Sequence, residues 1–156
     1  MENLVRRIGR IFKRNKETAT VTPSEPALRF RERMAALDAA LPRWVEQGGW
    51  RKPCRTLSEA AEDLGTDTVT LHHYFRDRAG LDFRTWRTRL RLEEAARLLE
   101  EEPDTKVTDI AERVGFSNRS NFSRQFHAHT GLTPAAWREK ARASSRRPGL
   151  TKTIYV

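Results

Sequence analysis

One stretch of this 156-residue chain, VGFSNRSNFSRQF at positions 114–126, combines two opposite kinds of side chain. Phe122 and Phe126 are four residues apart, as on the buried side of a helix. Small polar and basic residues fall on the other side, where a merely solvated face is the simplest alternative. Arginine can bind guanine O6 and N7 in the DNA major groove, and serine allows a close approach. The pattern favours a helix that reads base edges, with these candidate DNA-binding residues: Asn118, Arg119, Ser120, Ser123, Arg124 and His127.

A second stretch, TDTVTLHHYFRDRAG at positions 66–80, has the same construction. Leu71 and Phe75 take the apolar positions. On the opposite face a valine could contact a thymine methyl group, and a histidine can donate to guanine or phosphate. This set is less basic than the other, and its candidate DNA-binding residues are Thr68, Val69, His72, His73 and Arg76.

Other chemistry is poorly supported by the spacing of the remaining reactive residues. His72 and His73 are adjacent and point about 100° apart on a helix, which suits chelation badly. His127 and His129 are little better placed, and no carboxylate or cysteine lies at ligand spacing. Cys54 has no pattern of histidine and aspartate partners for nucleophilic catalysis. We therefore expect no enzyme activity, no catalytic residue, no metal and no cofactor.

Composition restricts the class of protein and its partners. There are 30 Lys and Arg against 21 Asp and Glu, a formal net charge of +9, which indicates nucleic acid or an anionic membrane surface as partner. A single cysteine excludes an internal disulfide and favours a reducing compartment. No apolar run approaches a membrane span, and no signal peptide is visible. Between Arg113 and Arg138 the chain has no acidic residue, which favours a face with a partner.

Three segments precede the candidate binding stretches. Residues 1–16 form a basic amphipathic segment, and residues 17–26 read as a flexible linker. A helical extension is predicted over residues 27–50, where Pro42 must kink the helix or restart it, and Gly48 and Gly49 end it. The four tryptophans sit in apolar helical patterns and are expected in the core. The residues leave open whether the basic segment binds a membrane surface, a partner or DNA, or is a disordered tail.

The rest of the chain predicts short helices and no strand. Thr56 and Glu59 have capping-box spacing, and Gly65 ends that first helix. We predict a first helix-turn-helix at about 56–80, a connector helix at about 83–102, a second helix-turn-helix at about 106–130 and a basic tail at 141–156. The predicted fold is all-α: two tandem helix-turn-helix subdomains joined by a long connector helix, with a helical N-terminal extension.

An internal duplication relates the two subdomains. Five positions within residues 57–65 recur, identical or similar in type, 50 positions later. Six positions within residues 71–87 recur 51 positions later, so one residue is inserted in the turn. The repeated positions include two glycines and a tryptophan, which makes coincidence improbable. Gly65 and its counterpart Gly115 are expected to supply a positive φ where the first helix of each subdomain ends.

The tandem units, the connector RLEEAARLLEE, the segment IAERVGFSNRSNFSRQF and the ending TGLTPAAWR resemble the DNA-binding module of the AraC/XylS family of transcription regulators. The resemblance covers about residues 57–138, within a domain that we place at 51–140. It implies two recognition helices that enter successive major grooves. It also implies a bacterial, cytoplasmic and nucleoid-associated regulator that can contact RNA polymerase.

Two classes of function follow from these observations. The first is a sequence-specific regulator of double-stranded DNA, for which a monomer suffices because it carries two recognition helices. The second is a non-specific nucleic-acid-binding or architectural protein that uses charge alone. The outer helix faces carry hydrogen-bonding side chains other than lysine, which favours the first class. A membrane-surface adaptor acting through residues 1–16 is a third alternative.

Overall fold

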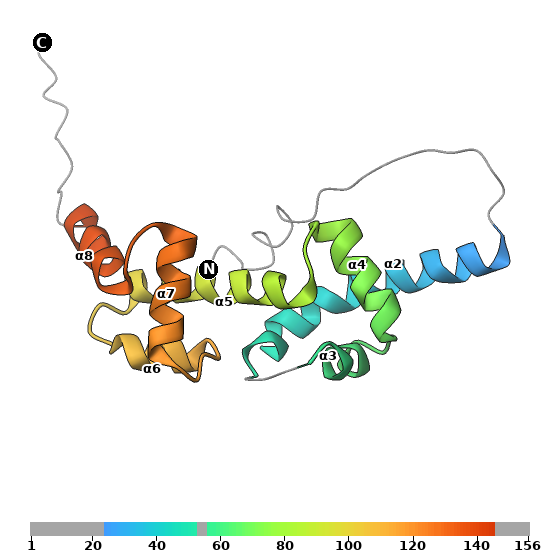
Figure 1. Ribbon diagram of the computed structural model, residues 1–156, viewed down its shortest axis with the longest axis horizontal. Helices are drawn as coiled ribbons and strands as arrows, with labels where there is room; N and C mark the ends of the chain where they lie inside the picture. The colour runs from blue at the N-terminus through green and yellow to red at the C-terminus, as the bar shows by residue number, and fades with distance from the viewer. Residues whose placement is uncertain (1–23, 53–55, 146–156) are drawn as a thin grey trace, which may run out of the picture. The chain divides into compact units, whose positions relative to one another are not determined.

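The computed structural model describes residues 24–52 and 56–145 of the chain. The basic segment 1–16, most of the predicted linker, Cys54 and most of the basic tail lie outside these residues. Within the described ranges the protein has seven α-helices, one short 3-10 helix and no strand, which confirms the predicted all-α class (Figure 1). No helix in these ranges is long and apolar enough to span a membrane.

The chain divides into two compact units, residues 1–91 and 92–156. In the first unit, α3 and α4 form one helix-turn-helix, and in the second unit α6 and α7 form the other. The predicted connector helix is α5, whose first half belongs to one unit and whose second half belongs to the other. The elements are α2 (Glu25–Glu46), η1 (Gly49–Arg51), α3 (Leu57–Asp63), α4 (Thr68–Ala79), α5 (Phe83–Glu101), α6 (Val107–Arg113), α7 (Arg119–Thr130) and α8 (Pro134–Ser145).

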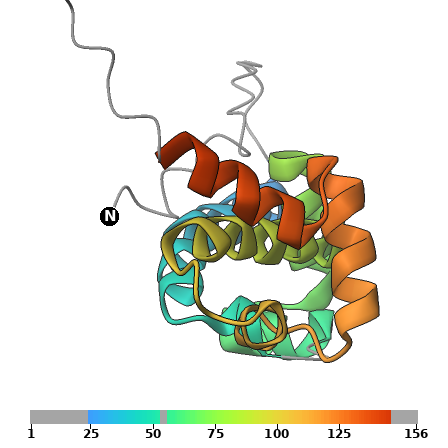
Figure 2. The same ribbon diagram turned by 90° about the vertical axis from the view of Figure 1, so that its left-hand side faces the viewer.

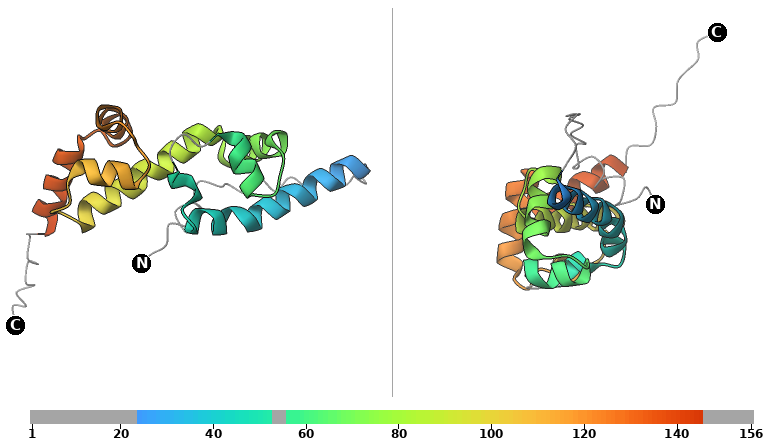
Figure 3. Two further views of the ribbon diagram at one scale, coloured as in Figure 1. Left: turned by 90° about the horizontal axis from the view of Figure 1, so that it is seen from below. Right: turned by 90° about the vertical axis from the view of Figure 1, so that its right-hand side faces the viewer.

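Helix α2 differs from its prediction at its start and at Pro42. It begins at Glu25, inside the predicted linker, because Pro26 suits the first turn of a helix, where its missing N–H costs nothing. It then continues through Pro42 to Glu46, so a restart at Pro42 is wrong. Pro42 loses one backbone hydrogen bond close to the end of the helix, while the buried Leu41, Trp44 and Val45 hold that end on the core. The first turns of α2 extend beyond α4 (Figure 1 and Figure 3), and residues 24–29 are exposed.

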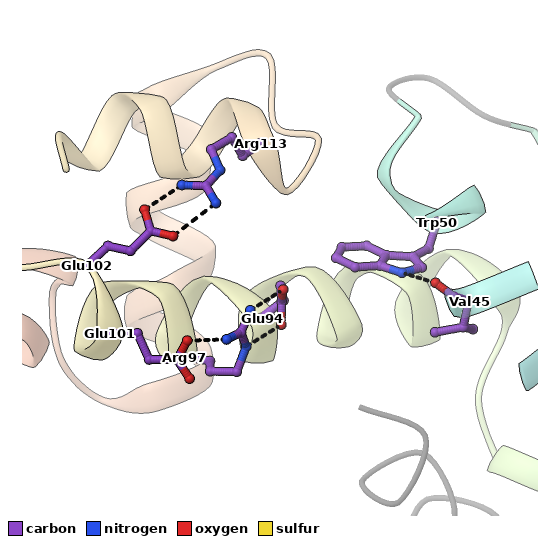
Figure 4. A network of polar contacts seen from close by, with 7 residues as sticks. All are labelled: Val45, Trp50, Glu94, Arg97, Glu101, Glu102 and Arg113. Carbon is purple, nitrogen blue, oxygen red and sulfur yellow. Dashed lines mark hydrogen bonds and ion pairs between the residues drawn. The ribbon is translucent and has the colours of Figure 1, made fainter. Parts of the chain in front are cut away.

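The core of the first unit consists of apolar side chains that the helical spacing predicts to be buried. Phe75 of α4 packs on Trp86 of α5, with ring centroids 4.7 Å apart, and both are fully buried. Trp50 is also fully buried, and its indole Nε1 donates to the carbonyl of Val45 at 3.0 Å (Figure 4). Arg91 of α5 is buried beneath it and donates to the carbonyls of Trp50 at 3.0 Å and Lys52 at 2.7 Å. The segment after α2 is thereby fixed to α5.

In the second unit, Phe122 and Phe126 of α7 are fully buried, and their rings meet at a tilt of 49° with centroids 5.6 Å apart. Figure 2 shows α8 turning away from α7 after the turn that joins them. Trp137 of α8 meets Phe126 edge to face and donates to the carbonyl of Ala96 at 3.3 Å. Trp137 is only half-buried, unlike the other three tryptophans, so the expectation of a core position holds less well for it.

Both helix-turn-helix units use the same backbone turn. Gly65 has φ +66° and Gly115 has φ +93°, as the duplication predicts. In each unit the glycine N–H bonds back to Glu62 or Glu112, and the next N–H bonds to Ala61 or Ala111. A residue with a Cβ would be strained in this left-handed conformation. The turn therefore sets the start of α4 and α7 in the same way relative to the helix before each.

Candidate nucleic-acid interface

Helix α7 presents the polar face that the sequence predicts. Its N-cap is Asn118, whose side-chain Oδ1 accepts the N–H of Asn121 at 2.8 Å. Asn118 therefore lies just before the helix, and its carbonyl oxygen is already engaged, which leaves its NH₂ group as the outward donor. Opposite the buried phenylalanines the predicted set is exposed apart from Ser123, which is half-buried: Asn118, Arg119, Ser120, Ser123, Arg124 and His127.

A residue that the sequence reasoning did not select organises this face. The Asn121 Oδ1 accepts one bond from Arg124 Nη2 at 3.0 Å and another from Gln125 Nε2 at 2.9 Å. Side chains three or four residues apart on a helix are neighbours. The contacts of Asn121 with Arg124 and Gln125 could therefore have been predicted from their spacing in the sequence. Neither Arg119 nor Arg124 pairs with a carboxylate among the described residues, and both guanidinium charges are available to an outside anion.

Helix α4 presents the corresponding face of the first unit, with Thr68, Val69, His72, His73 and Arg76 all exposed. Val69 has 64% of its surface exposed, and it is one of two large apolar side chains exposed among the described residues. An exposed apolar side chain near the start of a helix is of the type that contacts a thymine methyl group in a major groove. His72 also lines a hollow together with the exposed Arg84, the buried Arg87 and the carboxylate of Asp82.

The two histidines are oriented by ring contacts. The His73 ring meets Phe30 of α2 edge to face, with centroids 6.1 Å apart, and the His72 ring lies 6.0 Å from that of His73. The sequence reasoning gave Phe30 no part in the site, because a contact between residues 43 apart leaves no local pattern. No group of three potential metal ligands occurs among the described residues.

The start of α4 is capped by an acid. Asp67 Oδ1 accepts the N–H of Thr70 at 2.8 Å, and Oδ2 accepts the Thr70 hydroxyl at 2.7 Å. Arg33 of α2 pairs with the same carboxylate at 3.0 Å. The two bonds from Thr70, chiefly the backbone bond, and then the Arg33 charge lower the pKa of Asp67, so it is ionised at neutral pH.

Part of the acid-free basic segment is structural, which corrects the interpretation of that segment as one partner-binding face. Arg113 forms a two-point ion pair with Glu102, with N–O distances of 2.5 and 3.0 Å (Figure 4). Arg138 donates to the carbonyl of Thr105 at 2.6 Å. These two cations already have partners inside the second unit, whereas Arg119 and Arg124 lie exposed on the outer face of α7.

Comparison with known proteins bears on the same region. A family model described as a helix-turn-helix domain matches residues 60–140. The probable transcription factor PqrA of Proteus vulgaris is 33% identical over 97 residues, which cover 62% of this chain and 79% of that protein. The transcriptional regulatory protein YesN of Bacillus subtilis is 37% identical over 95 residues, covering 60% of this chain. The match spans 26% of YesN, so the chain covers about a quarter of that relative.

Solved structures agree with this assignment. The C-terminal domain of the two-component response regulator yesN from Fusobacterium nucleatum has a TM-score of 0.56 and 27% identity, covering 65% of this chain and 97% of that one. An AraC-type transcriptional regulator from Chromobacterium violaceum has a TM-score of 0.56 at 21% identity, covering 76% of this chain and 96% of that one, and shows the fold alone. The chain thus belongs to the AraC-type helix-turn-helix family, whose named members here are transcriptional regulators and not enzymes.

Proposed function

We propose that the protein is a sequence-specific transcription regulator that reads double-stranded DNA with α4 and α7. AraC-type helix-turn-helix domains bind double-stranded DNA. The observation that carries it is the outer face of α7, where Arg119 and Arg124 are exposed and not paired with any described carboxylate. The first residues of a recognition helix are those that reach base edges in the major groove. Arg119 and Ser120 occupy these positions on α7.

Direct base readout by Arg124 is supported by its orientation. The bond from Arg124 to Asn121 restricts the guanidinium before DNA arrives, which lowers the entropy lost when it binds guanine O6 and N7. A protein that only coats DNA gains nothing from such restriction, because phosphate contacts tolerate a mobile cation.

The first unit has a less basic reading face. Val69 and the two histidines suit contacts with a thymine methyl group, a base acceptor or a phosphate. Arg84, which is exposed and lines the hollow beside His72, suits the phosphates that flank the groove. We assign the same DNA-binding set to the site as the sequence predicts: Thr68, Val69, His72, His73, Arg76, Asn118, Arg119, Ser120, Ser123, Arg124 and His127.

Two recognition helices in one chain lead to a geometric proposal. Successive major grooves on one face of DNA lie about 34 Å apart, so a monomer should bind one site of roughly 15 to 20 base pairs. From the family resemblance we also propose that the protein acts in the cytoplasm on the nucleoid and that it contacts RNA polymerase.

Selection of bound duplexes from a random pool tests the proposed function. We expect strong enrichment of one sequence, bound at a stoichiometry of one protein per duplex. Affinity without enrichment would contradict sequence-specific recognition and favour an architectural protein. Sedimentation with anionic vesicles tests the alternative of a membrane-surface adaptor. The full chain is compared with a form that starts at Thr20, and an adaptor acting through residues 1–16 would bind the vesicles only as the full chain.

A further inference from the structure

The two recognition helices have matching N-caps that differ by one charge. Asp67 caps α4 by accepting the N–H of Thr70, and Asn118 caps α7 by accepting the N–H of Asn121. Both distances are 2.8 Å, and both caps lie at equivalent places in the duplicated units. The caps therefore make the same hydrogen bond, but the first carries a negative charge and the second is neutral.

A carboxylate at this place opposes DNA binding if α4 enters a groove as proposed above, and the inference rests on that function. The start of a recognition helix is its part closest to the DNA, where phosphates line the groove. The side chain of Asp67 is 48% exposed, so the protein does not bury its charge away from an approaching phosphate. Asn118 presents no such charge on α7.

Helix α2 supplies the opposite charge at this position. Arg33 Nη1 lies 3.0 Å from Asp67 Oδ2, although the two residues are 34 positions apart in sequence. The placement is set by the packing of α2 on α4: Phe30 meets His73, and Asp38 accepts the hydroxyl of Tyr74 at 2.8 Å. Arg33 lies between Phe30 and Asp38 on α2, so these two contacts hold it over the start of α4.

We propose that Arg33 neutralises the Asp67 carboxylate for DNA binding, so that α2 belongs to the DNA-binding surface of the first helix-turn-helix. Arg33 acts through Asp67 and is a positioning residue that does not itself need to touch a phosphate. The partner is the phosphate backbone beside the start of α4. An exposed ion pair contributes little to folding, so the consequence of the pair is expected in binding and not in stability.

A double-mutant cycle tests this proposal on the full chain and one selected duplex. Arg33→Ala should weaken binding about three- to fivefold at moderate salt, the effect of one unmasked surface charge. Asp67→Asn copies Asn118 and keeps the cap, so adding it to Arg33→Ala should restore affinity to within about twofold of the wild type. Urea unfolding should be nearly the same for all four proteins.

Arg78→Ala is the matched control, because Arg78 forms another α2–α4 ion pair of 3.0 Å, with Asp38, near the end of α4. It should leave DNA affinity unchanged. Wild-type affinity of Arg33→Ala would overturn the proposal. A loss that Asp67→Asn does not restore would mean that Arg33 itself binds phosphate, and an equal loss in Arg78→Ala would mean that α2 packing alone matters. Both results would also overturn it.

The outcome is separable from the proposed function. The ratio of affinities for the selected and a scrambled duplex should stay the same in every variant of the cycle, because readout by α7 is untouched. A wild-type ratio near one would contradict the proposed function. A high wild-type ratio with no effect of Arg33→Ala would contradict the masking of Asp67 alone.

Discussion

The indole Nε1 of Trp44 donates a 3.0 Å hydrogen bond to the Oδ2 of Asp63, the last residue of α3. The second unit has a counterpart: Arg113, at the end of α6 and 50 positions after Asp63, pairs with Glu102 just after α5. In each unit the first helix of the helix-turn-helix is thus tied at its end to the segment that supports it. The chemistry differs while the place is the same, which indicates that fixing this end matters in both units.

Replacing Trp44 by Phe should destabilise the first unit. Trp44 is 5% exposed, and the change removes both the bond to Asp63 and part of a buried ring, for an expected loss of about 1–3 kcal/mol in the free energy of unfolding. Urea unfolding followed by circular dichroism measures it. Asp63→Asn leaves the indole ring in place and keeps an acceptor, so it should cost clearly less. Equal losses in the two variants would show that the interactions of the Asp63 carboxylate, and not ring packing, account for the effect.

The Glu102–Arg113 pair should make the stability of the second unit depend on pH. Hydrogen bonding from Arg113 lowers the pKa of Glu102 in the folded protein below its ordinary value of 4.5. The pair's contribution is therefore present above about pH 4.5, and is lost as pH falls through the lowered pKa. Glu102→Gln should reduce the acid sensitivity of unfolding. Glu100→Gln, at an exposed carboxylate with no described ion pair, should leave it unchanged, and identical pH profiles for all three proteins would refute the linkage.

Arg91 should be a large contributor to the stability of the first unit. Truncation to Ala leaves the buried carbonyl of Trp50 and the part-buried carbonyl of Lys52 without this donor, at a cost of about 2–4 kcal/mol. Arg91→Lys keeps the charge but not the fork of donors, so it should recover only part of that loss. Thermal and urea unfolding of both variants check the order, and a fully stable Ala variant would contradict it.

Much of the fold could be predicted from the sequence, because buried apolar residues recur at helical spacing. Gly65 and Gly115 marked the turns through their need for positive φ, and Thr56 with Glu59 marked the start of α3. The continuity of α2 through Pro42 could not be predicted, because burial of the following residues outweighs the absence of one backbone hydrogen bond.

For the candidate site, the exposed faces of α4 and α7 were visible in the periodicity of their phenylalanine and leucine residues. What was missed are pairings between residues far apart in sequence, such as Arg33 with Asp67 and Phe30 with His73. Arg113 and Arg138 counted as basic charge in the sequence, but their long-range partners Glu102 and Thr105 make them structural. Local patterns report which face is buried, and they do not report which charges are already paired.

Arg124→Ala should cost about 1–3 kcal/mol of binding free energy on the selected duplex and relax base choice at one position. The reason is the loss of a two-point contact to guanine. Lys140→Ala, at an exposed cation on α8, should weaken selected and scrambled duplexes equally or not at all. Titrations with both duplexes give the comparison, and an equal loss on both by Arg124→Ala would remove α7 from direct readout.

Removal of the first nineteen residues, which gives the form that starts at Thr20, deletes six basic side chains and should leave the preferred sequence unchanged. The plot of log affinity against log salt concentration should become only slightly less steep. Its slope should change by about 0.9 for each phosphate that the segment would otherwise neutralise. Salt titrations of the full chain and the truncated form measure it. Loss of discrimination between selected and scrambled duplexes would assign sequence reading to that segment and not to α4 and α7.

The most direct test of readout by two recognition helices is to repeat the selection from a random duplex pool with the wild type, Arg124→Ala and His73→Ala. We expect the wild type to enrich two short blocks of preferred bases about one helical turn apart, roughly 10 base pairs. Arg124→Ala should lose preference within one block, and His73→Ala within the other. Loss of the same block by both variants, or a wild-type site with a single block, would contradict readout by two recognition helices.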